Sequence, residues 1–86
     1  MVLDTTLRNG ERVIAPQGAW RTERAPELAR AVDDLALEGP RVLIDGAALE
    51  SVDLTGAFFL RRLERRLAER GIDYRWADAR PDLLEF

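Results

Sequence analysis

The chain has 86 residues and a net charge of −3, its 13 basic residues are all arginine, and it contains neither cysteine nor histidine. This composition excludes disulfides, thiol nucleophiles, the usual zinc sites and histidine as a general base, and it gives no polybasic footprint for nucleic acid. We therefore expect a small binding domain that is not an enzyme and that needs no cofactor and no metal.

The first part of the chain carries the signal of a β-hairpin. Asn9 and Gly10 lie between two β-prone runs, and both residues tolerate the positive φ angles that a tight hairpin turn requires. The pattern predicts strands at Asp4–Arg8 and Arg12–Pro16.

An amphipathic helix is predicted between residues 19 and 39. Leu28, Val32 and Leu35 share one helical face, and Pro26 is tolerated in a first turn. Thr22 is the expected N-cap, and the Gly39-Pro40 pair is expected to end the helix.

The second half alternates strands and helices. An unbroken apolar run at residues 42–44 is typical of a central strand that is covered on both faces. A helix with Phe59, Leu60, Leu63 and Leu67 on its inner side follows and ends at Gly71. Residues 72–76 then alternate as a half-exposed strand does, and the final PDLLEF is typical of the first turn of a third helix.

Together these elements predict one α/β domain over residues 1–86. The expected order is β-β-α-β-α-β-α, with about four strands in a mixed sheet and the helices packed on one face of it. The incomplete third helix suggests a domain that is cut from a longer polypeptide or closely followed by another domain.

The turn VDLTG at residues 52–56 is the first candidate site. Asp53 can cap the following helix, Thr55 offers a hydroxyl near the helix start, and Gly56 allows close backbone packing. A helix N-terminus favours a negative group nearby, such as a phosphate or a partner's carboxylate. The alternative is that Asp53 or Thr55 serves only as an N-cap.

Phe58 is the second candidate. If Phe59 faces the sheet, the 100° step of a helix turns Phe58 outward, beside Arg61, Arg62 and Arg65. An exposed aromatic side chain among arginines has the composition of a protein interface. Alternatively, Phe58 is an isolated exposed residue or lies at the edge of the core.

Two further sets have simpler explanations. The acidic residues Asp45, Glu50, Asp53 and Asp78 have no spacing of a calcium loop or a two-metal site, so we interpret them as solvated loop carboxylates. Trp20 and Trp76 are expected in the core, with an interface role for Trp20 as the second possibility.

The order of these motifs resembles the STAS domain family. In that family a central strand with a hydrophobic-Asp pattern leads to an Asp-x-x-Gly turn, a leucine-rich helix that ends at a glycine, a strand and a Pro-started helix. Here the corresponding run is RVLIDGAALESVDLTGAFFLRRLERRLAERGIDYRWADARPDLLEF. The opening hairpin and the GAW stretch also stand where the family has them. The resemblance therefore covers nearly the whole chain and implies a STAS-like fold.

Within the family, GAWRTERAPELARAVDDL and VDLTGAFFL look most like the STAS domains that are fused to, or work with, MlaE-type permeases of bacterial ABC transporters for phospholipid. The resemblance implies a regulatory module that contacts the ABC ATPase subunit and the permease and reaches the membrane only through the transporter. The implied partner-binding residues are Asp53, Thr55, Gly56, Phe58, Arg61, Arg62 and Arg65. When isolated, such a domain is expected to be a monomer or a weak homodimer.

Two other branches of the family remain as alternatives. Anti-sigma-factor antagonists are phosphorylated on a Ser or Thr directly after the motif Asp, and that position is Leu54 here. Thr55 is the only hydroxyl in the turn and is the candidate acceptor of such a switch. A nucleotide-binding STAS domain is the other alternative. Because the N-terminus lacks a signal-peptide pattern and no apolar run spans a bilayer, the expected location is the cytoplasm. The resemblance to the transporter STAS domains further implies the cytoplasmic face of the inner membrane.

Overall fold

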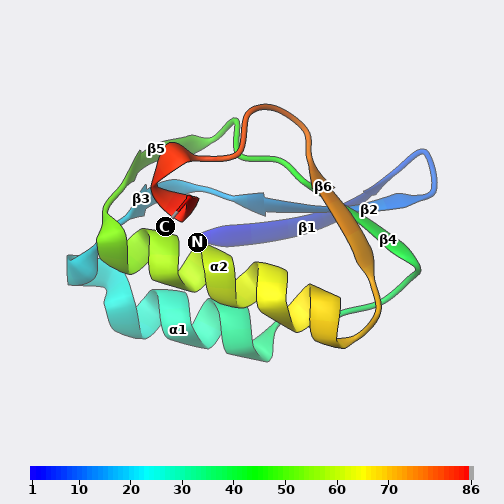
Figure 1. Cartoon of the computed structure of the whole chain (residues 1–86), viewed down its shortest axis with the longest axis horizontal. Helices are drawn as coiled ribbons and strands as arrows, with labels where there is room; N and C mark the ends of the chain where they lie inside the picture. Colours follow the sequence, from blue (N-terminus) through cyan, green and yellow to red (C-terminus); the bar gives the residue numbers. More distant parts are fainter. Residues whose placement is uncertain (86) are drawn as a thin grey trace.

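The computed structural model describes residues 1–85, which form an α/β fold around a mixed sheet of four strands (Figure 1). The strands lie in the order β1 (Leu3–Arg8), β2 (Glu11–Pro16), β4 (Arg41–Ile44) and β6 (Asp73–Trp76). β1 and β2 are antiparallel, while β2, β4 and β6 are parallel to one another. Both predicted hairpin strands are confirmed to within one residue, and β4 lies inside the sheet as predicted.

The hairpin turn forms for the expected reason. Asn9 and Gly10 adopt φ angles of 53° and 78°, the left-handed conformation that most residues avoid. Arg8 and Glu11 therefore face each other as the last pair of the β1–β2 ladder.

Both helices, α1 (Ala25–Asp34) and α2 (Leu54–Glu69), pack on one face of this sheet (Figure 1). The sheet contributes Ile14, Val42 and Ile44 to the core, and the helices add these buried side chains: Leu28, Val32, Leu60, Leu63 and Leu67. Trp20 is completely buried and Trp76 packs partly buried against the same cluster. The predicted inner face of α2 and the core positions of the two tryptophans are confirmed.

The predicted order of elements is incomplete. Two short strands, β3 (Gly18–Trp20) and β5 (Leu49–Val52), pair in parallel with each other and form a separate two-stranded sheet. A single 3₁₀ turn, η1 (Thr22–Arg24), precedes α1, and another, η2 (Asp82–Leu84), stands where the third helix was expected. β3, η1 and η2 have three residues each, too few to show a period, and the four residues of β5, LESV, neither alternate nor form an apolar run.

Both predicted ends of the first helix are wrong. Thr22 begins η1 rather than capping α1, whose N-cap is Arg24 without a side-chain hydrogen bond. The helix ends at Asp34, five residues before Gly39, and Leu35 is already extended. Arg66 of α2 donates from Nη1 to the carbonyl oxygens of Val32 and Leu35 and so satisfies the end of the helix from outside. The extended chain then places Leu37 in the core.

Within residues 1–85, no helix has both the length and the apolar character needed to cross a membrane.

Candidate functional site

Asp53 is the N-cap of α2, as the sequence predicts, but it also holds a second element. Its Oδ1 accepts a hydrogen bond of 2.9 Å from the Gly56 backbone N–H. Its Oδ2 accepts from the Thr22 backbone N–H at 2.9 Å and from the Thr22 hydroxyl at 3.1 Å. These hydrogen bonds, that of Gly56 first, hold the pKa of Asp53 below its ordinary value. One carboxylate thus joins the starts of α2 and η1.

The Thr55 hydroxyl belongs to the same network. It lies 2.8 Å from the Thr22 hydroxyl oxygen. The ionised Asp53 can only accept, so the Thr22 hydroxyl uses its hydrogen on Asp53 and must accept from Thr55. The Thr55 hydroxyl is therefore the hydrogen-bond donor of this contact, and the residue as a whole is half-buried.

This network predicts a measurable coupling between the two threonines. Thr55→Val is expected to lower the free energy of unfolding by about 0.5–1 kcal/mol, because it removes one hydrogen bond and keeps the side-chain shape. In a Thr22→Val background the same change is expected to have almost no effect. Urea denaturation of the four proteins measures the coupling, and Thr55→Ser is the control that keeps the hydroxyl. Fully additive effects would show that the hydroxyls do not depend on each other.

Gly56 is the position where α2 meets Trp20. A Cβ atom at Gly56 would lie 1.8 Å from the Trp20 carbonyl oxygen, so only glycine fits on this backbone. The same carbonyl accepts a hydrogen bond of 3.2 Å from the Asp53 N–H. The Trp20 indole is fixed in turn, since its Nε1 donates to the carbonyl oxygens of Val2 and Gln17, both at 3.1 Å. The close packing that the sequence predicts for Gly56 is confirmed.

The two phenylalanines divide as the helical phase predicts. Phe58 is 52% exposed, whereas Phe59 is half-buried and packs against the core. Their rings meet edge to face with centroids 5.1 Å apart. Leu54, one helical turn before Phe58, is also exposed, at 65%. Two large apolar side chains therefore lie together on the outer face of α2.

The three arginines predicted beside Phe58 are used differently. Arg61 donates to the Leu84 carbonyl at 2.8 Å and so binds η2 to the helix. Arg62 forms a two-point ion pair with Asp33 of α1, with N···O distances of 2.7 and 3.2 Å. Arg65 is exposed and forms no hydrogen bond or ion pair with any of residues 1–85. On this face, Arg65 is the arginine whose charge is not used inside the described part of the chain.

We name Leu54, Phe58 and Arg65 the α2 patch. They stand at positions i, i+4 and i+11 of one helix and therefore share its outer face. The patch combines apolar area at the start of the helix with one available guanidinium further along.

Glu64 is the buried charge of this region and is not among the residues that the sequence analysis singles out. Its side chain is only 5% exposed, and its carboxylate accepts from Arg80 Nε at 2.8 Å, from Arg80 Nη2 at 2.9 Å and from the Trp76 indole at 2.9 Å. Burial alone would raise the pKa of Glu64, but the hydrogen bonds from Arg80 and Trp76 outweigh it and hold the pKa below its ordinary value. A glutamate next to Leu63 and three residues before Leu67 was the available signal, because that position faces inward.

The predicted acidic set does not come together as a metal site. Across residues 1–85 no group of three or more carboxylates has an arrangement that could hold a metal ion. Asp45 instead accepts from the Ala47 backbone N–H at 3.0 Å and stabilises the turn after β4, and Asp53 is the cap described above.

Comparison with known proteins shows that the chain is similar in fold to solved structures. No protein-family model and no curated protein matches the chain. A solved structure described as "Crystal Structure Analysis of Mglu" has a TM-score of 0.68 at 21% identity over 88% of this chain and 19% of its own. A second, "Crystal Structure Analysis of Mglu in its native form", has a TM-score of 0.67 at 17% identity over 88% of this chain and 23% of its own. The chain spans about a fifth of the length of these proteins and shares with them a small α/β fold.

Proposed function

We propose that the chain is a non-catalytic protein-interaction domain of the STAS type, and that it docks on the ATPase subunit of a bacterial ABC transporter for phospholipid. In this proposal it regulates or supports assembly with an MlaE-type permease at the cytoplasmic face of the inner membrane. The observation that carries the proposal is the α2 patch, in which Phe58 remains half exposed although its neighbour Phe59 packs inward.

The patch suits a protein partner for an energetic reason. Exposed aromatic side chains contribute large area with few rotatable bonds, and they dominate the affinity of many interfaces. Burying the remaining surface of Phe58 and Leu54 is favourable at about 25 cal/mol per Å². Arg65 adds a guanidinium group that can donate charge-assisted hydrogen bonds to an acidic residue of the partner.

The transporter proposal is better supported than the kinase-switched antagonist. The residue directly after Asp53 is Leu54, which has no hydroxyl to phosphorylate. The Thr55 hydroxyl is bonded to the Thr22 hydroxyl, so a kinase would first have to break this contact. A phosphate there would also stand close to the Asp53 carboxylate and be repelled by it.

Phe58→Asp tests the proposal. We expect it to weaken binding to the purified ATPase subunit of the same organism about 30-fold or more, which corresponds to about 2 kcal/mol, because it places a charge in an apolar contact. Titration calorimetry measures the affinity, and the thermal midpoint of the free domain should stay within a few degrees of wild type because Phe58 is exposed.

The matched control is Leu7→Asp. Leu7 is 69% exposed at the end of the β1–β2 hairpin, on a different element from the patch. This variant should bind the ATPase subunit as wild type does. If Phe58→Asp and Leu7→Asp bind equally well, the α2 patch is not the docking surface.

A further inference from the structure

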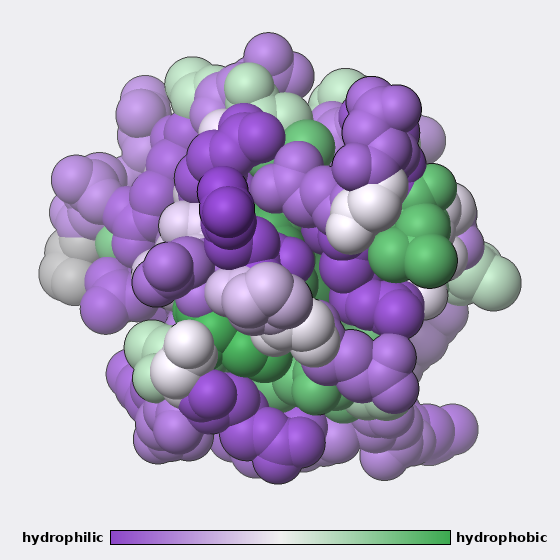
Figure 2. All heavy atoms as spheres, turned by 90° about the vertical axis from the view of Figure 1, so that its right-hand side faces the viewer, coloured by the Kyte–Doolittle hydropathy of each residue, from purple (hydrophilic) through white to green (hydrophobic). Residues whose placement is uncertain are grey.

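The face of the sheet opposite the helices carries a set of charged side chains. Because side chains alternate along a strand, Leu43 and Arg75 lie on this face while Val42 and Ile44 face the helices. Two ion pairs lie there, Arg75 of β6 with Glu11 of β2 at 3.4 Å, and Arg8 of β1 with Asp45, which follows β4, at 3.8 Å. Figure 2 shows the hairpin end of the molecule, where hydrophilic side chains surround a hollow in which hydrophobic atoms are visible.

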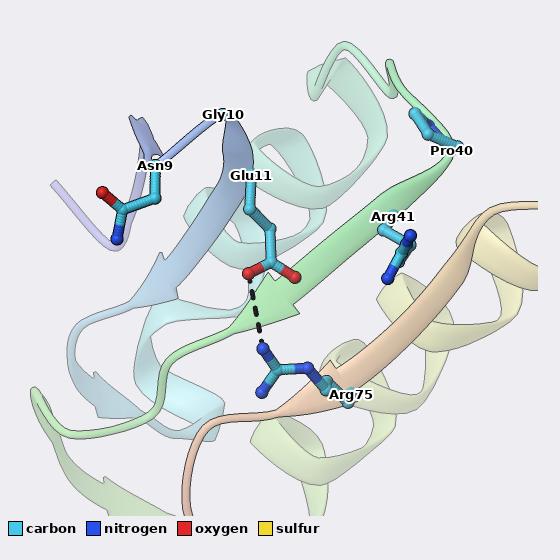
Figure 3. A pocket seen from close by; sticks show the side chains of 6 residues that line it. All are labelled: Asn9, Gly10, Glu11, Pro40, Arg41 and Arg75. Carbon is cyan, nitrogen blue, oxygen red and sulfur yellow. Dashed lines mark hydrogen bonds and ion pairs between the residues drawn. The ribbon is translucent and has the colours of Figure 1, made fainter.

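A groove of about 400 Å³ opens at this end of the sheet, where β2 and β4 begin (Figure 3). It is lined by Asn9, Gly10, Glu11, Pro40, Arg41 and Arg75. Its volume lies within the range of about 300–1,000 Å³ that small-molecule sites occupy. Gly10 leaves the rim open, because nothing stands within 4 Å of the position where its side chain would begin.

Two guanidinium groups border the groove, and their hydrogen-bonding capacity is largely unused. Arg41 is exposed and forms no hydrogen bond or ion pair with another residue in the range 1–85. Arg75 contacts Glu11 through one nitrogen at 3.4 Å, whereas an arginine can offer a carboxylate two parallel bonds. Each guanidinium has five N–H donors, so most of them remain available.

The register of the sheet brings these two charges together. Arg41 is opposite Asp73 and Leu43 is opposite Arg75, so Arg41 and Arg75 are diagonal neighbours on the same face of adjacent strands. Asp73 shares this face, but neither arginine is paired with it, and the nearby Glu11 is held only by the single long contact to Arg75. The two guanidinium groups thus stand beside two carboxylates, one that neither of them binds and one held by a single long contact, and an added anion can use their free donors.

We propose that the groove binds the carboxylate or phosphate group of a small organic anion between Arg41 and Arg75, and that this group displaces Glu11. In the structure the Glu11 carboxylate stands where one edge of the ligand's anion would contact Arg75 (Figure 3). The groove is larger than an inorganic ion requires, so the ligand has an organic body beyond its anionic group. This site is independent of the α2 patch and of the proposed ATPase contact.

Titration of the 86-residue chain with benzoate and with phenyl phosphate, followed by ¹H–¹⁵N NMR at constant ionic strength, tests the proposal. The two probes share an aromatic body and distinguish a carboxylate from a phosphate. We expect saturable shifts at the Gly10 amide and at the Nε–H signals of Arg41 and Arg75. Arg41→Gln and Arg75→Gln should each weaken binding at least five-fold. Unchanged thermal midpoints would confirm that both variants fold.

The decisive variant is Glu11→Gln, which removes the competing carboxylate. It should strengthen binding about five-fold, whereas Glu50→Gln, which removes an exposed charge on β5, should leave the affinity within two-fold of wild type. Equal effects of Glu11→Gln and Glu50→Gln, or shifts that are as large at Arg30 and Arg70 as at Arg41, would mean general charge attraction and would overturn the site.

Discussion

Gly56→Ala is expected to destabilise the domain by about 3 kcal/mol or more, and in a chain of this size such a loss can prevent folding. The added Cβ would lie 1.8 Å from the Trp20 carbonyl oxygen, 2.6 Å from its carbonyl carbon and 2.8 Å from its Cβ. These are mainly backbone atoms, so no rotation of a side chain relieves the contact, and α2 must move away from β3. Thermal and urea denaturation, or the yield of soluble protein, measures the loss.

Gly46→Ala provides the comparison. Its Cβ would meet the Trp76 ring at 3.2 Å and a Leu49 methyl group at 3.3 Å, and both are side chains that can shift by a few tenths of an ångström. We expect a cost of about 1 kcal/mol or less at this position. If Gly56→Ala is no less stable than Gly46→Ala, the contact between α2 and Trp20 is looser than the structure shows.

Glu64→Gln is expected to lower the free energy of unfolding at pH 7 by about 1–2 kcal/mol. The glutamine keeps the shape but has one acceptor oxygen where the carboxylate has two, so its amide nitrogen faces an N–H donor of Arg80 and one of the two bonds is lost. The bond that remains is to a neutral group and is weaker than a bond to a carboxylate. Arg80 is 29% exposed and can be partly hydrated in the variant, so the full cost of a deeply buried unpaired charge does not apply.

The pH dependence of Glu64 identifies the carboxylate as the cause. Its pKa in the folded domain is below the ordinary value of 4.5, so its contribution is fully present above about pH 4.5 and fades as the pH falls through the folded pKa. The stabilities of wild type and Glu64→Gln should therefore differ at pH 7 and converge in acid. Glu69→Gln, on the exposed side of α2, should follow wild type throughout. A difference that persists unchanged in acid would count against the ion pair with Arg80.

The parts of the fold that the sequence predicts well are determined by residues close to one another along the chain. The Asn9-Gly10 turn, the apolar β4 and the inner face of α2 each have a local pattern, and the outward position of Phe58 follows from that of Phe59 by helical phase alone. The third helix and the end of α1 were wrong because residues distant in sequence decide them. Arg66 donates hydrogen bonds to the carbonyl oxygens at the end of α1, and Arg61 donates one to the Leu84 carbonyl oxygen of η2.

The candidate site shows the same division. The cap at Asp53 and the requirement for a small residue at Gly56 are visible in the turn itself. Its second bonding partner, Thr22, lies 31 residues earlier and has no pattern that points to Asp53. Among residues 1–85, Arg61 and Arg62 are bonded and Arg65 is not, and this difference depends on the positions of η2 and α1. Helical spacing alone cannot predict these contacts.

The contacts between the two helices change how substitutions on α2 must be interpreted. α1 has 10 residues, fewer than the roughly 12–15 at which an isolated helix becomes even marginally stable in water. Its surroundings therefore maintain it, through Asp53 at Thr22 before its start, Arg62 at Asp33 and Arg66 at its last carbonyls. If a variant of Arg62 or Arg66 binds a partner poorly, the loss of order in α1 is a sufficient cause, even where the arginine does not touch the partner. Arg65, which holds nothing in place among residues 1–85, is the arginine of α2 whose removal reports on recognition itself.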